Sequence, residues 1–334
     1  MRRLTLRATA ISAAALVVAG VTGAGPAVAA SRTINIAYMS FAVANSYDAP
    51  MLAAARAVAQ SSGAKLTVFD ANNDPTTQYN QIQNVIATGK YQGIIVQPIY
   101  GAALIPVIKQ AIAKKIKVVN IDQILGTNYE STKIQVKGLS GNVVFAPPAI
   151  ATAMGNLVTQ ACAASGANPC KVGYLWSLKA SALDVTMKKV FDSVIAKTPS
   201  IQIVAEGESY WTPTAGLSAT QNMLQANPDL NVVVGADQGI EGAAQAVAGA
   251  GKTGKVALVG YGGSAAGLNA VKSGAWFGTV MQAPATTGEL GMRALIKAIR
   301  TGKASGVINP IAGFANKGVV TKANAKKFLG EWPG

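Results

Sequence analysis

The sequence predicts an α/β protein with two similar lobes, each a mainly parallel sheet flanked by helices. Short β-branched segments alternate with longer helical segments from residue 33 onward, and the alternation occurs in two successive series. The two series also share motifs at matching spacings. Half of the 334 residues are hydrophobic and only 13% are charged, which is enough apolar material for two cores.

The first series begins with INIAYMS, a segment typical of a strand, and continues with an Ala-rich helix that ends at a glycine. The apolar run in YQGIIVQP indicates a buried strand. In chain order the expected strands are 34–40, 65–71, 91–98 and 116–122, and the expected helices between them are 48–63, 75–89 and 103–115.

The second series has the same rhythm. Its expected strands are 170–177, 201–209, 230–237, 255–263 and 276–282, and its helices are 182–197, 215–227, 239–251 and 265–274. The stretch QIQNVIATGKYQGIIVQP is mirrored by ATQNMLQANPDLNVVVGAD, and each is followed by a helix and a Lys-Val strand. Gly93 and Lys117 are 24 positions apart, as are Asn231 and Lys255. We therefore expect two lobes rather than one long sheet, with a junction near residues 138–142.

Residues 1–29 have the pattern of a secretory signal peptide. Three arginines precede a short apolar stretch, and Ala-Val-Ala at 27–29 is a small-x-small cleavage site. The alternative is a membrane anchor, which the short run, broken by glycines and Pro26, disfavours. No later segment has the eighteen consecutive apolar residues typical of a membrane span. We expect a chain that is periplasmic or secreted after cleavage.

Cys162 and Cys170 are the only cysteines, and an even count in an exported chain favours a disulfide between them. The alternative is two separate buried thiols. Two cysteines at this spacing do not form a zinc site, so we expect no bound metal.

The net charge of +15 raises the question of nucleic-acid binding. The lysines, however, are spread along helices and loops, as at 114–117 and 322–327, without a basic stripe interleaved with aromatic residues. We interpret them as solvated faces, and expect a monomer that does not bind nucleic acid.

The stretch GAGKTGK, residues 249–255, satisfies the spacing of a phosphate-binding loop. Such a loop requires a strand, then glycines, then a helix whose N-terminus faces the anion. Here a predicted helix precedes the glycines and a strand follows them, and Val256 stands where a Ser or Thr is required. The stretch is therefore predicted to connect a helix to a strand, with no nucleotide or other cofactor.

Catalytic groups are scarce. The chain has no histidine, so it lacks the commonest general base, and the GGSAAG stretch around Ser264 has no partner for a triad. Paired carboxylates at Asp122 and Asp237 leave an exported hydrolase as an alternative. Binding without catalysis is the simpler interpretation.

Polar and aromatic residues follow the predicted strands, at the sheet edge where open α/β proteins bind ligands. Carboxylates, amides and flat aromatic rings together suit a polyhydroxylated ligand, although each residue taken singly is also explained by helix capping or packing. The candidates are Ser40, Asn45, Tyr47, Asp48, Gln97, Asp122, Gln123, Asp184, Trp211, Asp237 and Gln282, with Tyr100 and Gln238 beside them.

These residues lie in stretches that resemble the bacterial periplasmic sugar-binding proteins of the ribose-binding type. INIAYMSFAVANSYDAP and GIIVQP carry the likeness in the first lobe, and WTPTAGLSATQNMLQANPDLNVVVGADQGIEGAAQAV in the second. The resemblance implies the type I periplasmic binding protein fold, with two Rossmann-like lobes joined by a three-stranded hinge. It implies an N-terminal lobe of 32–141 plus 283–310 and a C-terminal lobe of 142–282 plus 311–334. It also implies closure on a small-molecule ligand and delivery to an ABC permease in the inner membrane.

Some positions depart from the family pattern. Gln123 stands where the family commonly has an arginine, the arginine near Asp184 is missing, and Gly262 replaces an aspartate. These departures argue against ribose itself, and the absence of arginine from the expected cleft argues against an anionic ligand. We expect a neutral sugar or polyol. A cationic or aromatic ligand is the alternative, and a transcription regulator with the same lobes is opposed by the export signal.

Overall fold

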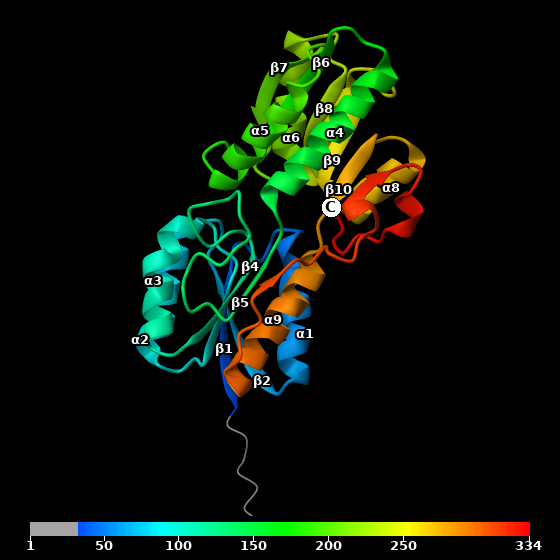
Figure 1. Cartoon of the computed structure of the whole chain (residues 1–334). Coiled ribbons are helices and arrows are strands. Elements are labelled where there is room, and N and C mark those ends of the chain that lie inside the picture. Colours follow the sequence, from blue (N-terminus) through cyan, green and yellow to red (C-terminus); the bar gives the residue numbers. More distant parts are fainter. Residues whose placement is uncertain (1–32) are drawn as a thin grey trace, which may run out of the picture. The chain divides into compact units, whose positions relative to one another are not determined.

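The computed structural model describes residues 33–334, which contain two six-stranded sheets with helices on their faces (Figure 1). The predicted fold class, two α/β lobes, is confirmed. The predicted signal peptide lies outside the described residues. Within residues 33–334, no helix combines the length and the apolar character needed to cross a bilayer.

The first sheet is parallel throughout and has the strand order β11-β5-β4-β3-β1-β2. Its strands are β1 (Ile34–Ser40), β2 (Ala64–Asp70), β3 (Gly93–Val96), β4 (Lys117–Asp122), β5 (Gly141–Val144) and β11 (Val307–Ile308). Its helices are α1 (Asp48–Ser61), α2 (Pro75–Thr88), α3 (Gly101–Ala113) and α9 (Pro284–Thr301). Alternate side chains of β1 enter two cores: Ala37 and Met39 pack with α2 and α3, whereas Ile36 and Tyr38 pack with α1 and α9.

The second sheet has the order β12-β10-β9-β8-β6-β7, the same topology with one edge strand, β12, running antiparallel to β10. Its strands are β6 (Cys170–Trp176), β7 (Ile201–Glu208), β8 (Val232–Ala236), β9 (Ala257–Gly262), β10 (Gly278–Met281) and β12 (Val319–Thr321). Its helices are α4 (Pro147–Ser165), α5 (Ala182–Ile195), α6 (Pro213–Ala226), α7 (Asp237–Gly249) and α8 (Ala265–Ser273). Short 3-10 turns occupy Ala315–Gly318 and Ala325–Lys327.

Several helices begin at side chains that satisfy the unpaired N–H groups of the first turn. At α2, the Asp74 carboxylate accepts a hydrogen bond from Thr77 N at 2.8 Å, and Gly89 with φ of 60° ends the helix. Equivalent N-terminal caps start α5, α6 and α8, at Ser181, Thr212 and Ser264. Local sequence signals thus fix where these helices begin.

The GAGKTGK stretch lies between the end of α7 and the start of β9. Gly251 and Gly254 have φ of 65° and 77°, left-handed values that favour glycine. The order of helix, glycines and strand is the predicted one. No helix N-terminus follows the glycines to receive a phosphate.

The chain passes from one sheet to the other three times: from β5 to α4, from β10 to α9, and from β11 to β12. Because β5 extends the first sheet to Val144, the boundary expected after residue 141 falls inside a strand, and the first crossing follows Val144. Helix α9 comes late in the chain but packs on α1 and the first sheet. We retain the remaining lobe limits as a proposal.

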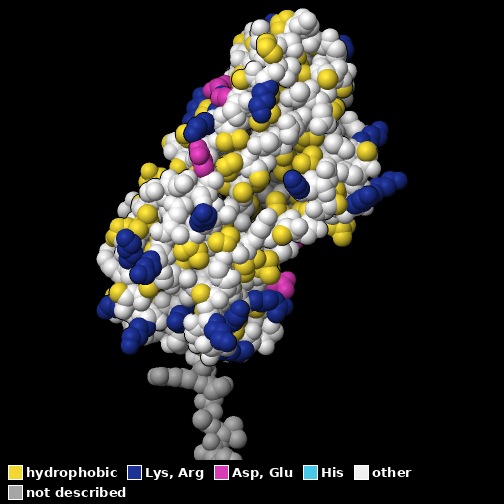
Figure 2. All heavy atoms as spheres, in the orientation of Figure 1, with side chains coloured by type: hydrophobic (Ala, Val, Ile, Leu, Met, Phe, Trp, Pro, Cys, Tyr) yellow, Lys and Arg dark blue, Asp and Glu magenta, His cyan; other side chains and the backbone are white. Residues whose placement is uncertain are grey.

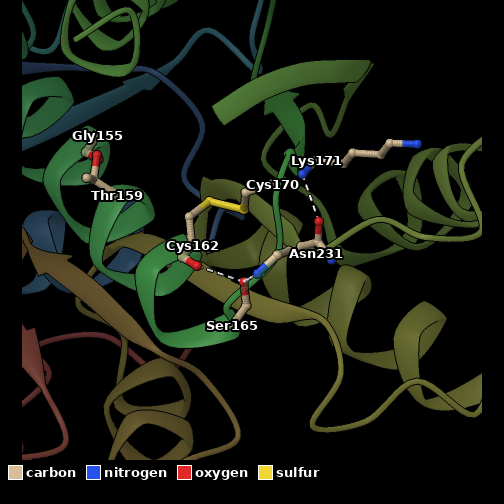
Figure 3. The surroundings of a disulfide bond; sticks show 8 residues. Gly155, Thr159, Cys162, Ser165, Cys170, Lys171 and Asn231 are labelled. Carbon is tan, nitrogen blue, oxygen red and sulfur yellow. Dashed lines mark hydrogen bonds between the residues drawn. A yellow bond between two sulfur atoms is a disulfide. The ribbon is translucent and has the colours of Figure 1, made fainter. Parts of the chain in front are cut away.

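The structure contains the predicted disulfide, which joins Cys162 near the end of α4 to Cys170 at the start of β6 with a Cα–Cα distance of 5.7 Å (Figure 3). Both cysteines are buried. Nearby, Ser165 Oγ donates to Cys162 O at 2.8 Å and Lys171 N donates to Asn231 Oδ1 at 2.8 Å. The bridge therefore fixes a helix end against a strand that is already well anchored.

Lysine and arginine side chains are distributed over both lobes on the face drawn in Figure 2, with apolar side chains between them. This spread agrees with the interpretation of the positive charge as solvated surface.

Candidate ligand-binding site

A cavity of about 540 Å³ is lined by residues of both lobes. The first lobe contributes residues at or after the ends of β1, β2, β3, β4 and β5, and the second contributes residues at or after the ends of β6, β7, β8, β9 and β10. These are the carboxyl ends of parallel strands, where the sequence analysis expected the ligand. The volume is in the range of roughly 300–1,000 Å³ that small-molecule sites occupy.

Gln97 connects two carboxyl groups in the first-lobe wall. Its Nε2 donates to Asp48 Oδ1 at 2.6 Å and to Asp122 Oδ2 at 3.3 Å. The hydroxyl of Tyr47 donates to Asp122 Oδ1 at 2.9 Å. We call Tyr47, Asp48, Gln97 and Asp122 the acidic cluster. Its protein hydrogen bonds leave further carboxylate lone pairs for a ligand that donates hydrogen bonds.

Burial changes the acid strength of both carboxyl groups. Desolvation raises the pKa of Asp48 to about 8, against the hydrogen bond from Gln97, and the nearby charge of Asp122 raises it further. Desolvation also raises the pKa of Asp122 to about 6, against the hydrogen bonds from Tyr47 and Gln97. Burial thus favours the neutral form of both carboxyl groups, and it does so more strongly for Asp48 than for Asp122.

Among the described residues that line the cavity, none is a lysine or an arginine. The negative charge of the acidic cluster is thus stabilised by amide, phenol and backbone N–H donors rather than by a cationic side chain of the described wall. Such a wall suits hydroxyl or protonated amine groups and disfavours anions.

The second lobe supplies aromatic rings and amides. The ring of Trp211 meets Phe41 of the first lobe edge to face, with centroids 6.2 Å apart. Tyr261 lines the cavity, and its hydroxyl lies 2.8 Å from Ser177 Oγ. Gln238 Nε2 donates across the cavity to Asn45 Oδ1 at 3.4 Å. Flat rings and amide groups of the second lobe thus line the same cavity as the acidic cluster.

Five non-glycine lining residues have a left-handed backbone: Asn72 with φ of 48°, Asn73 with 65°, Asp122 with 67°, Tyr210 with 49° and Trp211 with 50°. This conformation costs a non-glycine residue on the order of 1–3 kcal/mol and is concentrated at functional sites. Its occurrence on both sides of one cavity supports a role in binding.

Most of the predicted site residues lie in the cavity wall. They are Asn45, Tyr47, Asp48, Gln97, Asp122, Gln123, Trp211 and Gln282, together with Gln238. Tyr100 is half exposed and lies outside the cavity wall.

Ser40, Asp184 and Asp237 were also expected to contact ligand, but they do not line the cavity. Ser40 is buried at the end of β1. Asp184 accepts hydrogen bonds from Ser177 N at 2.8 Å and Ser181 Oγ at 2.7 Å, which fixes the start of α5.

Asp237, directly after β8, accepts a hydrogen bond from Ser264 N at 2.7 Å and another from Thr279 Oγ1 at 2.8 Å. These bonds connect the end of β8 to Ser264, which follows β9, and to Thr279 in β10. Like Asp184, Asp237 accepts hydrogen bonds from residues of its own lobe. Both residues follow strands, which is why the sequence pattern alone did not separate them from cavity residues.

A model of the periplasmic binding protein domain matches residues 36–304. The chain belongs to this family. Its relatives include the xylitol-binding protein of Mycolicibacterium smegmatis, 30% identical over 284 residues that cover 84% of this chain and 76% of the relative. The D-allose-binding periplasmic protein of Escherichia coli is 28% identical over 253 residues, covering 73% of this chain and 78% of the relative.

Solved structures of periplasmic binding proteins share the fold. A solute-binding protein of an ABC transporter from Mycobacterium smegmatis, solved with glycerol, has a TM-score of 0.76 at 23% identity, covering 91% of this chain and 100% of that one. Proteins of this family bind solutes for transport and are not enzymes, so the expectation of no catalysis is confirmed. The family also implies a periplasmic location.

Five aromatic residues of this periplasmic binding protein were missed in the sequence analysis: Phe41, Phe145, Tyr210, Tyr261 and Trp332 all line the cavity. Phe41 directly follows β1, and its position was a usable signal. Trp332 lies far beyond the last expected strand, so no strand-end rule points to it.

Proposed function

We propose that this protein is exported and binds one neutral sugar or polyol in the cavity between its lobes, which it then delivers to an ABC permease. The observation that carries the proposal is that the acidic cluster shares one cavity with aromatic rings and amides, with no cation in the described wall. Hydroxyl groups donate to the carboxylates, while C–H faces pack on the rings. Relatives named for xylitol, D-allose and ribose support this ligand class.

Closure of the lobes follows from a ligand that touches both walls. Such a ligand stabilises the closed form by its differential affinity for that form, and the permease then distinguishes loaded from empty protein. We propose that the protein acts as a monomer after removal of residues 1–29. N-terminal sequencing of the exported protein and light scattering would test these two points.

The ligand class is tested by titration calorimetry with xylitol, D-allose, D-ribose, D-xylose and myo-inositol. A ligand at 100 times its dissociation constant adds about 2.7 kcal/mol to the free energy of unfolding, so a thermal-shift screen can precede the titrations. Failure of every sugar and polyol to bind would refute the proposal.

A second candidate is a ligand with a protonated amine, because the acidic cluster has no cationic partner in the described wall. The screen therefore includes putrescine and D-glucosamine. Binding of an amine that weakens steeply as salt rises would favour this candidate over a neutral polyol.

A further inference from the structure

Residues 330–334, which we call the Trp332 segment, contact both lobes next to the cavity. Trp332 is 3% exposed and forms part of the cavity wall. Aromatic side chains at such positions contribute large contact areas to binding.

The Trp332 segment is attached to the second lobe by three backbone-directed hydrogen bonds. Trp332 Nε1 donates to Gly262 O at 2.9 Å. The first N–H groups of α8, at Ala265 and Ala266, donate to the carbonyls of Trp332 at 2.9 Å and Pro333 at 3.0 Å. A Cβ on Gly262 would come within 2.7 Å of the Trp332 ring, so the absence of a side chain there makes room for the indole.

The same segment is attached to the first lobe. The Glu331 carboxylate accepts hydrogen bonds from Thr286 N at 2.9 Å and from its hydroxyl, in the first turn of α9. The negative charge of Glu331 at a helix N-terminus is favourable. The Trp332 ring also meets Tyr47 edge to face, with centroids 5.4 Å apart, and Tyr47 belongs to the acidic cluster.

We propose that Trp332 contacts the ligand and determines its specificity, and that Glu331 positions Trp332 by tying the segment to α9. This inference rests on the proposed function. Because the indole N–H is already donated to Gly262 O, the ring offers the ligand apolar contact only. The ligand should thus have hydroxyl groups on the side toward the acidic cluster and C–H groups on the side toward Trp332.

The chain offers a matched control. Trp276 is also 3% exposed, but it is packed in the core of the second lobe and does not line the cavity. We compare W332F, W332A and W276F by calorimetry with xylitol and D-allose, after thermal melting has established that each variant is folded. We expect W332A to weaken binding about tenfold or more, W332F to lose less, and W276F to stay within about threefold of wild type.

Wild-type protein provides a second measurement that does not depend on how a variant folds. In 15N-labelled protein, the Trp332 indole resonance is assigned by its loss in W332F and the Trp276 resonance by its loss in W276F. Saturating xylitol or D-allose should shift the Trp332 resonance and leave that of Trp276 in place.

The positioning role of Glu331 is tested by E331Q, with the exposed E289Q of α9 as control. We expect E331Q to weaken binding about threefold to tenfold although Glu331 does not line the cavity. In the double variant E331Q/W332F, the two losses of binding free energy should not add, because Glu331 acts on the ligand through Trp332.

The outcomes separate the two proposals. If wild type binds no sugar or polyol, the proposed function fails and this inference fails with it. If wild type binds, but W332A matches W276F and the Trp332 resonance does not move, the inference alone is overturned. Additive losses in E331Q and W332F would overturn the role of Glu331.

Discussion

Replacement of Asp48 by asparagine should remove about 2 kcal/mol of the pH dependence of stability between pH 6 and 8. Asp48 is buried, and its pKa of about 8 lies well above the 3.8 of an exposed aspartate. In this range the unfolded side chain is ionised while the folded one still binds a proton. The folded state thus binds more protons, so stability is greatest at low pH and falls as pH rises through about 8.

The size of the effect follows from linkage. A pKa of about 8 in the folded state gives a loss of about 2 kcal/mol between pH 6 and pH 8 from this residue alone. Asparagine keeps an oxygen to accept the 2.6 Å hydrogen bond from Gln97 and cannot titrate. The variant should therefore have a flatter profile. Glu241, with a pKa raised by burial to about 7, titrates in both proteins and cancels in the comparison.

Urea denaturation of ligand-free protein at half-unit steps from pH 6 to pH 8 measures the effect. The control is D229N, because Asp229 is exposed and paired with Lys171, which lowers its pKa, so it stays ionised throughout this range. Wild type and D229N should lose stability in parallel. If D48N loses as much stability as wild type over these two pH units, Asp48 is already ionised in the folded protein and the reasoning is wrong.

Two further predictions concern stability. Replacing both cysteines by serine should lower the free energy of unfolding by about 2–3 kcal/mol, because the disulfide no longer restricts the short loop in the unfolded chain. A loss under about 1 kcal/mol in urea denaturation would contradict this prediction. D237A should cost roughly 2–4 kcal/mol of stability, because Ser264 N and the Thr279 hydroxyl lose their buried acceptor, while ligand affinity in the folded protein stays within about threefold. A large loss of ligand affinity with unchanged stability would instead show that Asp237 contacts the ligand.

The fold was largely predictable because the strands carry strong local signals. INIAYMS and GIIV are apolar and β-branched, and caps such as Ser181 and Ser264 begin the helices. The lobe limits were placed by the family resemblance, but the short strands β5 and β11 beside them were not assigned. Strand β5 has four residues and β11 only two, so neither is long enough to show a period.

Site residues were predictable where their position after a strand is enough to place them at the cavity. Asp48, Gln97 and Asp122 follow strands whose carboxyl ends meet, and the structure brings them within hydrogen-bonding distance. The same rule also selected Asp237, because a strand end does not reveal whether a carboxylate faces the cavity or the neighbouring strand. Trp332 depends on tertiary contacts with Gly262 and Tyr47, which a single sequence does not specify.

The path of α9 has a consequence for how the protein is made. The core on one face of the first sheet needs Met292, Leu295 and Ile296, which are synthesised about 150 residues after β5. At roughly 5–20 residues per second, the ribosome leaves that apolar face uncovered for many seconds. The first lobe therefore cannot complete this core until α9 has been synthesised.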